Sequence, residues 1–294
     1  MYKNFIKFSC FFILILMING CSGSNSKQQL IDKAGAPLLS GLGDHSHLIS
    51  SDQEGVQEYF NQGLVLAFAF NHAESVRSFK AAQTLDPSCA MCFWGEALAR
   101  GPNINVTSNG KAVMSDEQRV NAFEALSKAK DLMVNSTSQE QAYITALSSR
   151  YDGDISSDRN ALDIAYAVAM EKVVETYPDD MDAASLYSEA LMNTMPWNYW
   201  LDDGKPRADT VKVISKLEEV LEKEPDHPLA IHLYIHAVEA SNSPERAESA
   251  ADRLGSLVPG AGHLVHMPAH IFWRVGRYHD ASEANINAAK VDEE

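Results

Sequence analysis

Sequence features that mark several common enzyme classes are missing from this chain. It has no glycine-rich phosphate loop, no nucleophile elbow of the Gly-x-Ser-x-Gly type and no dinucleotide-binding fingerprint, which argues against the enzyme classes built on those motifs. Basic residues are also scarce, with 24 Lys and Arg against 40 Asp and Glu. This balance argues against nucleic-acid binding and against a basic membrane-contact face, and it suits cationic partners or metal ions.

The N-terminus has the composition of a lipoprotein signal peptide. A short basic end precedes an apolar run over residues 8–18, which is too short to cross a bilayer. The following Ile-Asn-Gly-Cys, ending at Cys21, resembles the lipobox at which bacterial lipoproteins are cleaved and lipidated; an ordinary signal peptide with an incidental Cys is the alternative. By that resemblance residues 1–20 are removed and Cys21 is lipidated. Ser22 at the next position then favours the outer membrane of the cell envelope, facing the periplasm.

Cysteine is scarce as well, and only one pair remains as thiols after lipidation. The chain has four Cys, of which Cys10 lies in the signal peptide. Cys89 and Cys92 form a Cys-x-x-Cys motif, for which we expect a local disulfide in an exported protein. Each alternative needs a feature that this sequence does not have. A four-cysteine zinc site needs a second Cys pair, a c-type haem site needs His where Phe93 stands, and a thioredoxin-like site needs a βαβ context.

Two segments follow the predicted cleavage site. Residues 21–50 are expected to form a flexible tether and N-terminal segment, because residues 22–33 are rich in Gly, Ser, Asn and Lys. Residues 51–294 show an even spread of Ala, Leu and charge, which predicts one domain without a change of type along the chain.

Residues 51–294 carry a helical repeat. Counting back from Pro87 as position 32 of a 34-residue tetratricopeptide (TPR) unit places Tyr59, Gly63, Phe79 and Ala82 at signature positions. We therefore expect an all-α, TPR-like superhelix (an α-solenoid) of about six helix pairs. The first helices of the pairs are expected at residues 56–68, 90–100, 138–150, 181–193, 228–240 and 262–274. The second helices are expected at residues 73–85, 116–133, 159–176, 209–223, 243–256 and 278–290.

Three units are longer than the TPR norm, and their extra residues fall between the first and second helix. Insertions gathered on one face of a repeat array often mark a binding face. We expect a ligand-binding rim formed by Asn103, Asn105, Trp197 and Trp200; long solvated loops are the alternative. The chain ends within its last unit without a polar capping helix, from which we expect a truncated sequence; an exposed end that meets a partner is the alternative. The insertions of the three longer units, between their first and second helices, cover residues 101–114, 152–158 and 194–208.

Histidines recur at equal repeat positions near the end of the chain. Positions 4, 7, 8 and 11 of a first helix pack on the second helix, so positions 5 and 9 share another face. His232 and His236 take these positions in the fifth unit, and His266 and His270 take them in the sixth. Glu189 stands at position 9 of the fourth unit. We expect these side chains to line an open, concave groove and to carry little core packing.

Two His on one helix that face two on the next can converge on one metal ion, because packed helices lie roughly 8–10 Å apart. Imidazole and carboxylate ligands suit zinc or copper, and also nickel or iron. A zinc protease is excluded because Leu233 stands where its catalytic Glu would be. Hydrogen-bonded or solvated His is the alternative. The candidate ligands are His232, His236, His263, His266 and His270, with Glu189 or Glu239 as ligand or general base.

Two further features bear on this site. Pro268 prefers a first helical turn, and a helix that begins there would leave His263 and His266 in the preceding loop. His45 and His47 lie in the N-terminal segment and could fold over the groove.

Three stretches carry a resemblance beyond the generic repeat: YFNQGLVLAFAFNHAESVRSF, LDPSCAMCFWGEALARGPNIN and HLVHMPAHIFWRVGRYHDA. They are similar to a family of exported bacterial TPR lipoproteins, over residues 41–294. Members of that family run past the point where this chain ends, which also favours truncation. The family implies no established reaction.

Two functions therefore remain open. The first is a lipid-anchored TPR scaffold that binds a protein, a peptide or another ligand in its concave groove and meets the membrane only through its anchor. The second is a metal-dependent, hydrolase-like enzyme with a His-rich centre in the same groove.

Overall fold

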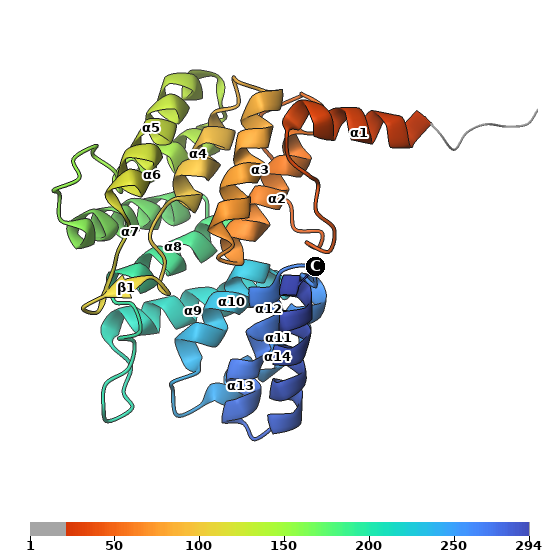
Figure 1. Ribbon diagram of the computed structural model, residues 1–294. Helices are drawn as coiled ribbons and strands as arrows, with labels where there is room; N and C mark the ends of the chain where they lie inside the picture. The colour runs from red at the N-terminus through yellow and green to blue at the C-terminus, as the bar shows by residue number, and fades with distance from the viewer. Residues whose placement is uncertain (1–21, 294) are drawn as a thin grey trace, which may run out of the picture.

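The computed structural model describes residues 22–293, and its regular secondary structure is almost all α-helix (Figure 1). The only strands within these residues form a two-residue hairpin, Thr107–Ser108 with Lys111–Ala112. The prediction of an all-α chain is therefore confirmed. The predicted signal peptide and Cys21 lie outside the described residues. Within residues 22–293, no helix has both the length and the apolar character needed to cross a bilayer.

The helices follow one another in six pairs, and each first helix contacts the second helix of its pair. Their bounds lie close to those expected from the repeat. The first helices are α2 (Val56–Phe68), α4 (Ala90–Ala99), α6 (Ser138–Leu147), α8 (Met181–Thr194), α10 (Pro228–Val238), and α12 (Gly262–His266) continued by α13 (Pro268–Arg274). The second helices are α3 (His72–Leu85), α5 (Asp116–Leu132), α7 (Arg159–Thr176), α9 (Ala208–Lys223), α11 (Glu248–Leu257) and α14 (Tyr278–Glu293). Short 3-10 turns, η1 (Met133–Asn135) and η2 (Pro244–Ala247), precede α6 and α11.

Local sequence explains how several of these helices begin. Ser115 and Gln118 form a capping box at the start of α5, and Thr137 and Glu140 form another at α6. Pro268 explains the division of the sixth first helix, because proline has no N–H to donate to the preceding turn. The backbone between α12 and α13 keeps helical dihedral angles, so the preceding histidines lie on a helix and not in a loop.

The array curves until its fifth pair meets its first, since α10 contacts α2. The end of α2 and the turn after it, residues 68–70, pack on the face of α10 that carries His232 and His236. These two side chains are only 0% and 2% exposed. The expectation that they line an open groove with little core packing is therefore wrong.

The N-terminal segment is ordered on the array. Helix α1 (Ser22–Ala34) occupies the stretch for which composition predicts a flexible tether, and that prediction of local structure is wrong. Gln28 bonds Asp32 one turn later, and Leu30 lies against Gly55, where an added Cβ would be 2.6 Å from the leucine. These two contacts lie in the second half of α1, which they help to hold against the array.

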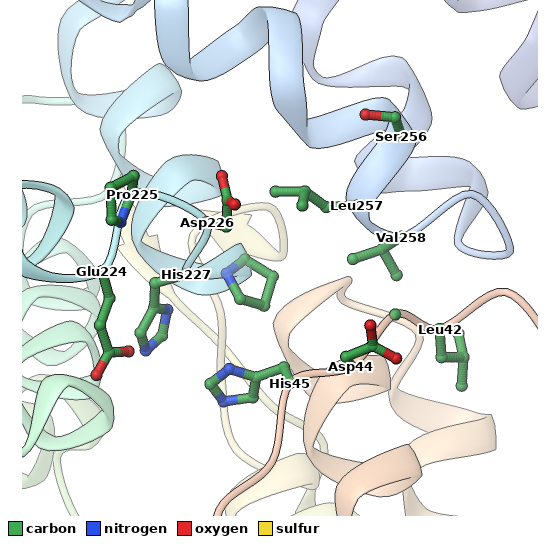
Figure 2. Close-up of a pocket in the computed structure, with 12 residues that line it drawn as sticks. Leu42, Asp44, His45, Glu224, Pro225, Asp226, His227, Ser256, Leu257 and Val258 are labelled. Atoms are coloured by element: carbon green, nitrogen blue, oxygen red, sulfur yellow. The ribbon is translucent and has the colours of Figure 1, made fainter.

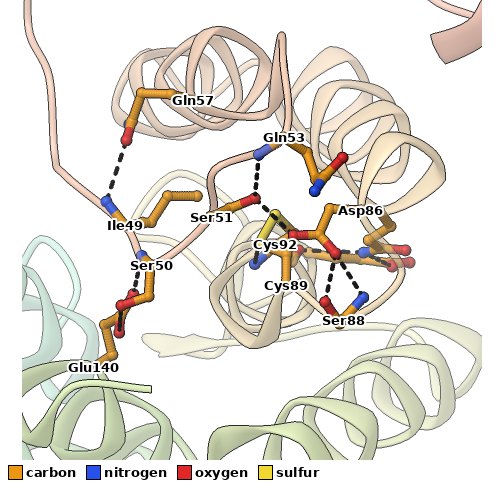
Figure 3. The surroundings of a disulfide bond; sticks show 12 residues. Ile49, Ser50, Ser51, Gln53, Gln57, Asp86, Ser88, Cys89, Cys92 and Glu140 are labelled. Carbon is orange, nitrogen blue, oxygen red and sulfur yellow. Dashed lines mark hydrogen bonds between the residues drawn. A yellow bond between two sulfur atoms is a disulfide. The ribbon is translucent and has the colours of Figure 1, made fainter. Parts of the chain in front are cut away.

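Residues 36–51, which we call the strap, follow α1 without regular secondary structure and cross several first helices. Gln57, Asn61 and Gln62 of α2 bond the backbone of the strap, which pairs groups that a strand or helix would otherwise satisfy. Ser50 donates to Glu140 of α6, and the next residue, Ser51, donates to Asp86 (Figure 3). The strap thus ties the first pair to the third.

Cys89 and Cys92, the pair for which a local disulfide is expected, are joined by one in the structure (Figure 3). The Cys89 sulfur also accepts from the backbone N–H of Cys92 at the start of α4. The disulfide lies in the first turn of α4, beside the point where Asp86 holds the strap.

Candidate metal centre

Five histidines gather where α10 meets α12 and α13. On α10, His232 Nδ1 lies 2.7 Å from the carbonyl oxygen of Phe68. A carbonyl only accepts, so this nitrogen carries the proton and His232 Nε2 presents a lone pair. That Nε2 lies 3.1 Å from His263 Nε2, across the junction between the two helices. We call the cluster the histidine centre; its members are His232, His236, Glu239, His263, His266 and His270.

His236 is oriented by a carboxylate. Its Nδ1 donates to Glu239 Oε1 over 3.0 Å, which leaves the lone pair on Nε2. His236 Nε2 is buried and has no hydrogen-bond partner. One nitrogen each from His232, His236 and His263 lie within 4.8 Å of one another, a spacing that can hold a metal ion.

His266 and His270 form a second pair of facing nitrogens. His266 Nδ1 donates to Asn285 Oδ1 (2.6 Å), and the amide nitrogen of Asn285 donates in turn to the carbonyl of Ala281, which sets the orientation of the amide. His270 Nδ1 donates to Glu239 Oε2 (2.6 Å). Both Nε2 atoms therefore present lone pairs, yet they lie 2.9 Å apart. Two lone pairs at that distance repel unless a proton or a metal ion lies between them.

The observed separations match those of nitrogens that share an ion. With a metal–nitrogen bond of about 2.0–2.1 Å, two ligands are about 2.9 Å apart at a right angle and about 3.3 Å apart in a tetrahedron. The two facing pairs, at 3.1 and 2.9 Å, fall in this range, which overlaps that of N–H···N hydrogen bonds, so these distances fit either arrangement.

Burial keeps the inner imidazoles neutral. It lowers the pKa of His232 and His236, and it lowers the pKa of His263 to about 3, with the neighbouring histidines adding to the effect. Neutral imidazole is the form that binds metals. For Glu239, burial acts to raise the pKa, but the hydrogen bonds from His236 and His270 outweigh it and lower the pKa to about 2. Glu239 is therefore an ionised carboxylate that orients two imidazoles.

Two pockets flank the histidine centre and share His266 and Asn285 in their walls. One, of about 560 Å³, is lined by Trp197 and Trp200 of the insertion after α8. The other, of about 710 Å³, is lined by Asn103 and Asn105 of the insertion after α4. The four residues expected to form a ligand-binding rim thus line pockets on the two sides of the histidines.

Two expected site residues have other roles. Glu189 belongs to none of the metal-sized groups among the described residues. It accepts from Asn193 on its own helix, and burial raises its pKa although the charge of Arg150 opposes the rise. Asn103 is buried and donates to Nε2 of His72, whose Nδ1 donates to a backbone carbonyl, so His72 is fully satisfied.

Helical periodicity places Trp273 on the stripe of His266 and His270, and it lines the 560 Å³ pocket. Sequence reasoning missed two other neighbours of the histidine centre. Phe70 lies with its ring 4.5 Å from that of His232, and Asn285 orients His266. Each of these two stands in a segment whose role depends on contacts distant in sequence. For Asn285 a signal existed, since the first turns of α14 must face α12 in a helical pair.

A second cluster, the strap clamp, lies where the strap crosses α8. The buried carboxylate of Asp182 accepts from His45 Nε2 (2.9 Å) and from His47 Nδ1 (2.8 Å). His227 Nε2 lies 3.2 Å from the same carboxylate, while its Nδ1 accepts from the N–H of Ala230 in the first turn of α10. His227 therefore carries its proton on Nε2 and donates it to Asp182. The strap does fold over the array at its two histidines, and His227 is the member that sequence reasoning missed.

Carboxylates surround the histidines of the strap clamp. His45 and His227 lie beside each other at the edge of a pocket of about 480 Å³ whose wall includes Asp44, Glu224 and Asp226 (Figure 2). Burial acts to lower the pKa of His47, but its hydrogen bond to Asp182 and the charges of Asp182, Asp180 and Glu140 raise it. The Asp182 pKa is well below its usual value, because hydrogen bonds from the three histidines outweigh its burial.

Comparison with known proteins identifies no family: no family model and no curated protein matches this chain. The resemblance to exported TPR lipoproteins stays a prediction. The chemistry of the two clusters is therefore argued from their own atoms.

Proposed function

We propose that this protein is a TPR-like, lipid-anchored protein of the cell envelope that binds a transition-metal ion in the histidine centre. The observation that carries the proposal is His236 Nε2, a buried lone pair without a hydrogen-bond partner, within 4.8 Å of nitrogens from His232 and His263. A buried polar atom left unpaired costs about 1–3 kcal/mol. A metal ion removes that cost by bonding to it.

The Nε2 atom of His236 lacks a proton to bind, because Nδ1 of that ring already donates to Glu239 and no donor lies near Nε2. Between His232 and His263, a neutral His263 with its proton on Nε2 can donate to His232 Nε2, so this pair accommodates either a hydrogen bond or an ion. A metal ion bonds to neutral imidazoles and needs no positive charge on the ring. Three neutral imidazoles with a carboxylate behind one of them are typical of zinc and copper sites.

Glu239 has the position of a supporting group and not of a general base. Both of its oxygens accept hydrogen bonds from ligand candidates, His236 and His270. Such carboxylate–histidine pairs hold metal-binding rings in orientation and fix their tautomer. We therefore propose metal binding for this centre and assign no reaction to it.

The TPR-like architecture is supported by the packing of signature residues. Phe79 of α3 fits between α2 and α4 at the places of Gly63 and Gly95, where an added Cβ would lie 2.9 and 2.2 Å from the ring. Glycine is required at both places because no side chain fits beside the ring. This is the contact that the Gly and Phe of the TPR signature imply.

A second function, peptide binding on the concave face, is favoured by the strap. This extended segment lies on first helices and is bound through its backbone by Gln57, Asn61 and Gln62. A face that binds an extended segment of its own chain has the groups needed to bind one from a partner. The anchored N-terminus and the strap are continuous, so binding of a partner there would compete with the strap.

Elemental analysis of the purified mature protein tests the metal proposal. We expect about one equivalent of zinc or copper in the wild type, and below about one tenth in His236→Gln and His263→Ala, since loss of a ligand exceeds the 10–100-fold cost of losing an outer-shell partner. His236→Gln preserves volume at the buried position. His279→Ala, an exposed histidine of α14, is the matched control and should retain the metal.

The same preparations are checked for folding by circular dichroism. Wild-type protein that contains no stoichiometric metal and takes up none from zinc or copper solutions overturns the proposal. Folded His236→Gln and His263→Ala proteins with full metal content overturn it equally.

A further inference from the structure

Large aromatic side chains are left exposed beside the histidine centre. Trp197, Trp200 and Trp273 line the pocket of about 560 Å³ together with His236, His266 and His270. Trp197 is 47% exposed and Trp273 is 63% exposed. Large exposed apolar groups around a concave site are typical of ligand-binding surfaces, and this volume falls within the roughly 300–1,000 Å³ of small-molecule sites.

The indole of Trp197 is held over the centre at a conformational cost. Its backbone has φ of 62°, in the left-handed region that a bulky residue rarely adopts. Its ring meets that of His236 edge to face, with centroids 5.1 Å apart. Strain of this kind, roughly 1–3 kcal/mol, persists where the surrounding structure holds a side chain in a functional position.

The loop that carries Trp197 is fastened to the helix of the centre. Trp200 Nε1 donates to the carbonyl of Ala237 on α10 over 2.9 Å. Tyr199, one residue before, is buried and lies with its ring 6.4 Å from that of Trp197. The aromatic wall is thus positioned before any ligand arrives, which lowers the entropic cost of binding.

The charges around the pocket select the sign of a ligand. Three neutral imidazoles leave the double positive charge of a bound ion uncompensated, and Glu239 offsets only one unit of it. The guanidinium of Arg274 also lines the pocket, where it donates to the backbone carbonyls of Glu239 and Ser241. Because the charges of Glu239 and Arg274 offset each other, a bound divalent ion would make the net charge facing the pocket positive, which favours an anion over a cationic ligand of the type bound in aromatic cages.

We propose that this pocket, the aromatic pocket, binds a small flat aromatic anion that stacks on Trp197 and Trp273 and turns its anionic oxygens toward the metal ion. The inference rests on the proposed metal function, since the ion supplies the positive charge that holds the head group. An ion held by three protein nitrogens would have a fourth position for such an oxygen, on the side of His236, the one of the three ligand residues that lines this pocket.

Two hydroxamates separate the contribution of the ligand's aromatic ring from that of its metal-binding head group. Benzohydroxamate and acetohydroxamate carry the same chelating head, and only the first has a ring. With protein loaded with Co²⁺, whose visible absorption changes on coordination, we expect benzohydroxamate to bind at least about tenfold more tightly, equal to the roughly 1.4 kcal/mol within reach of one aromatic contact. Quenching of tryptophan fluorescence should follow the same titration.

A matched pair of variants tests whether the ring of benzohydroxamate binds against Trp273. Trp273→Ala should weaken benzohydroxamate at least about fivefold and leave acetohydroxamate and cobalt content unchanged, because an aromatic contact contributes about 0.5–1.5 kcal/mol. Tyr278→Ala removes an aromatic residue of equal exposure, 65%, that does not line the pocket, and should change neither affinity.

The outcomes separate this inference from the metal proposal. Equal affinities for the two hydroxamates, or full benzohydroxamate affinity in Trp273→Ala, overturn the aromatic pocket while the cobalt content upholds the metal centre. Tighter binding of a neutral ring, such as benzamide, than of benzohydroxamate overturns the anionic head group. Protein that takes up no cobalt overturns the aromatic pocket as stated here, and elemental analysis of the purified protein then judges the metal proposal.

Discussion

The histidine centre and the strap clamp have similar ligand-atom spacings, but they differ in whether every buried nitrogen has a hydrogen-bond partner. Each contains a group of three whose ligand atoms lie within 4.8 Å of one another. In the strap clamp, Asp182 accepts from all three histidines, and the remaining nitrogen of His227 caps α10. In the histidine centre, the carboxylate of Glu239 accepts from Nδ1 of His236 and of His270, and Nε2 of His236 is buried without a hydrogen-bond partner.

This difference shows what decides between a metal site and a structural network. The spacing of the candidate ligand atoms alone would predict a metal ion in both clusters. Where each proton has an acceptor, an ion must displace hydrogen bonds that already satisfy a buried carboxylate. Where a buried imidazole nitrogen has no hydrogen-bond partner, as at His236, an ion supplies the missing partner. We therefore expect metal in the histidine centre alone, and we expect the strap clamp to fasten the N-terminal segment to the array.

The largest expected effect comes from removing the charge at the centre of the strap clamp. Asp182→Asn keeps the shape of the side chain but leaves at least one histidine N–H facing an amide donor. We expect the free energy of unfolding to fall by about 2–3 kcal/mol, measured by urea denaturation. The strap should also become a site of early proteolysis. Asp179→Asn, at an exposed carboxylate three residues away, should have no effect.

Asp182→Asn also tests whether the two clusters differ in metal binding. Because no ion is expected at Asp182, the metal content of folded Asp182→Asn should equal that of the wild type. An ion lost together with this carboxylate would show that the strap clamp is itself a metal site.

A smaller effect is expected from Glu239→Gln, which leaves the metal ligands in place and removes the carboxylate behind them. The amide can accept from only one of His236 and His270, so one ring loses its orientation. We expect zinc affinity to fall about 10–100-fold, measured by competition with a chromogenic chelator. Glu245→Gln, an exposed residue of the same helical pair, is the control. Unchanged affinity would remove Glu239 from the account of the centre.

The fold was predictable from the sequence because its determinants are local. The spacing of Tyr59, Gly63 and Phe79 within one unit reflects contacts between adjacent helices, and the prolines mark where units end. The histidines of α10, α12 and α13 were predictable as one group for the same reason: helical periodicity places equal repeat positions on equal faces.

Long-range closure made the rest unpredictable. His232 bonds the carbonyl of Phe68, 164 residues earlier, and this contact both buries α10 and sets the tautomer of the ring. No periodic pattern reports that the fifth pair meets the first. Glu189 shows the opposite limit, since it stands at the equivalent position on α8 yet lies near Arg150, because the array turns between neighbouring helices.

The smallest expected effect concerns pH and the strap. The pKa of His47 is raised above its ordinary 6.5, because the hydrogen bond and charge of Asp182, with Asp180 on α8 and Glu140 on α6, outweigh burial. A raised pKa means that the folded form binds the proton more tightly than the unfolded form. The stabilisation is therefore complete below the ordinary pKa and is lost as the pH rises through the folded value.

Hydrogen exchange measures this effect at the strap itself. The backbone N–H of Ser50, which donates to Glu140, should lose protection as the pH rises above about 6.5, after correction for intrinsic exchange. His47→Gln retains a donor for Asp182 but has no titrating group, so its protection should be independent of pH over the same range. Equal pH dependence in both proteins would place the titration elsewhere, and protection that rises with pH in the wild type would contradict the assigned sign. A protected, pH-independent strap in the wild type would mean that the neutral imidazole, which still donates from Nδ1, holds Asp182 as well as the imidazolium does.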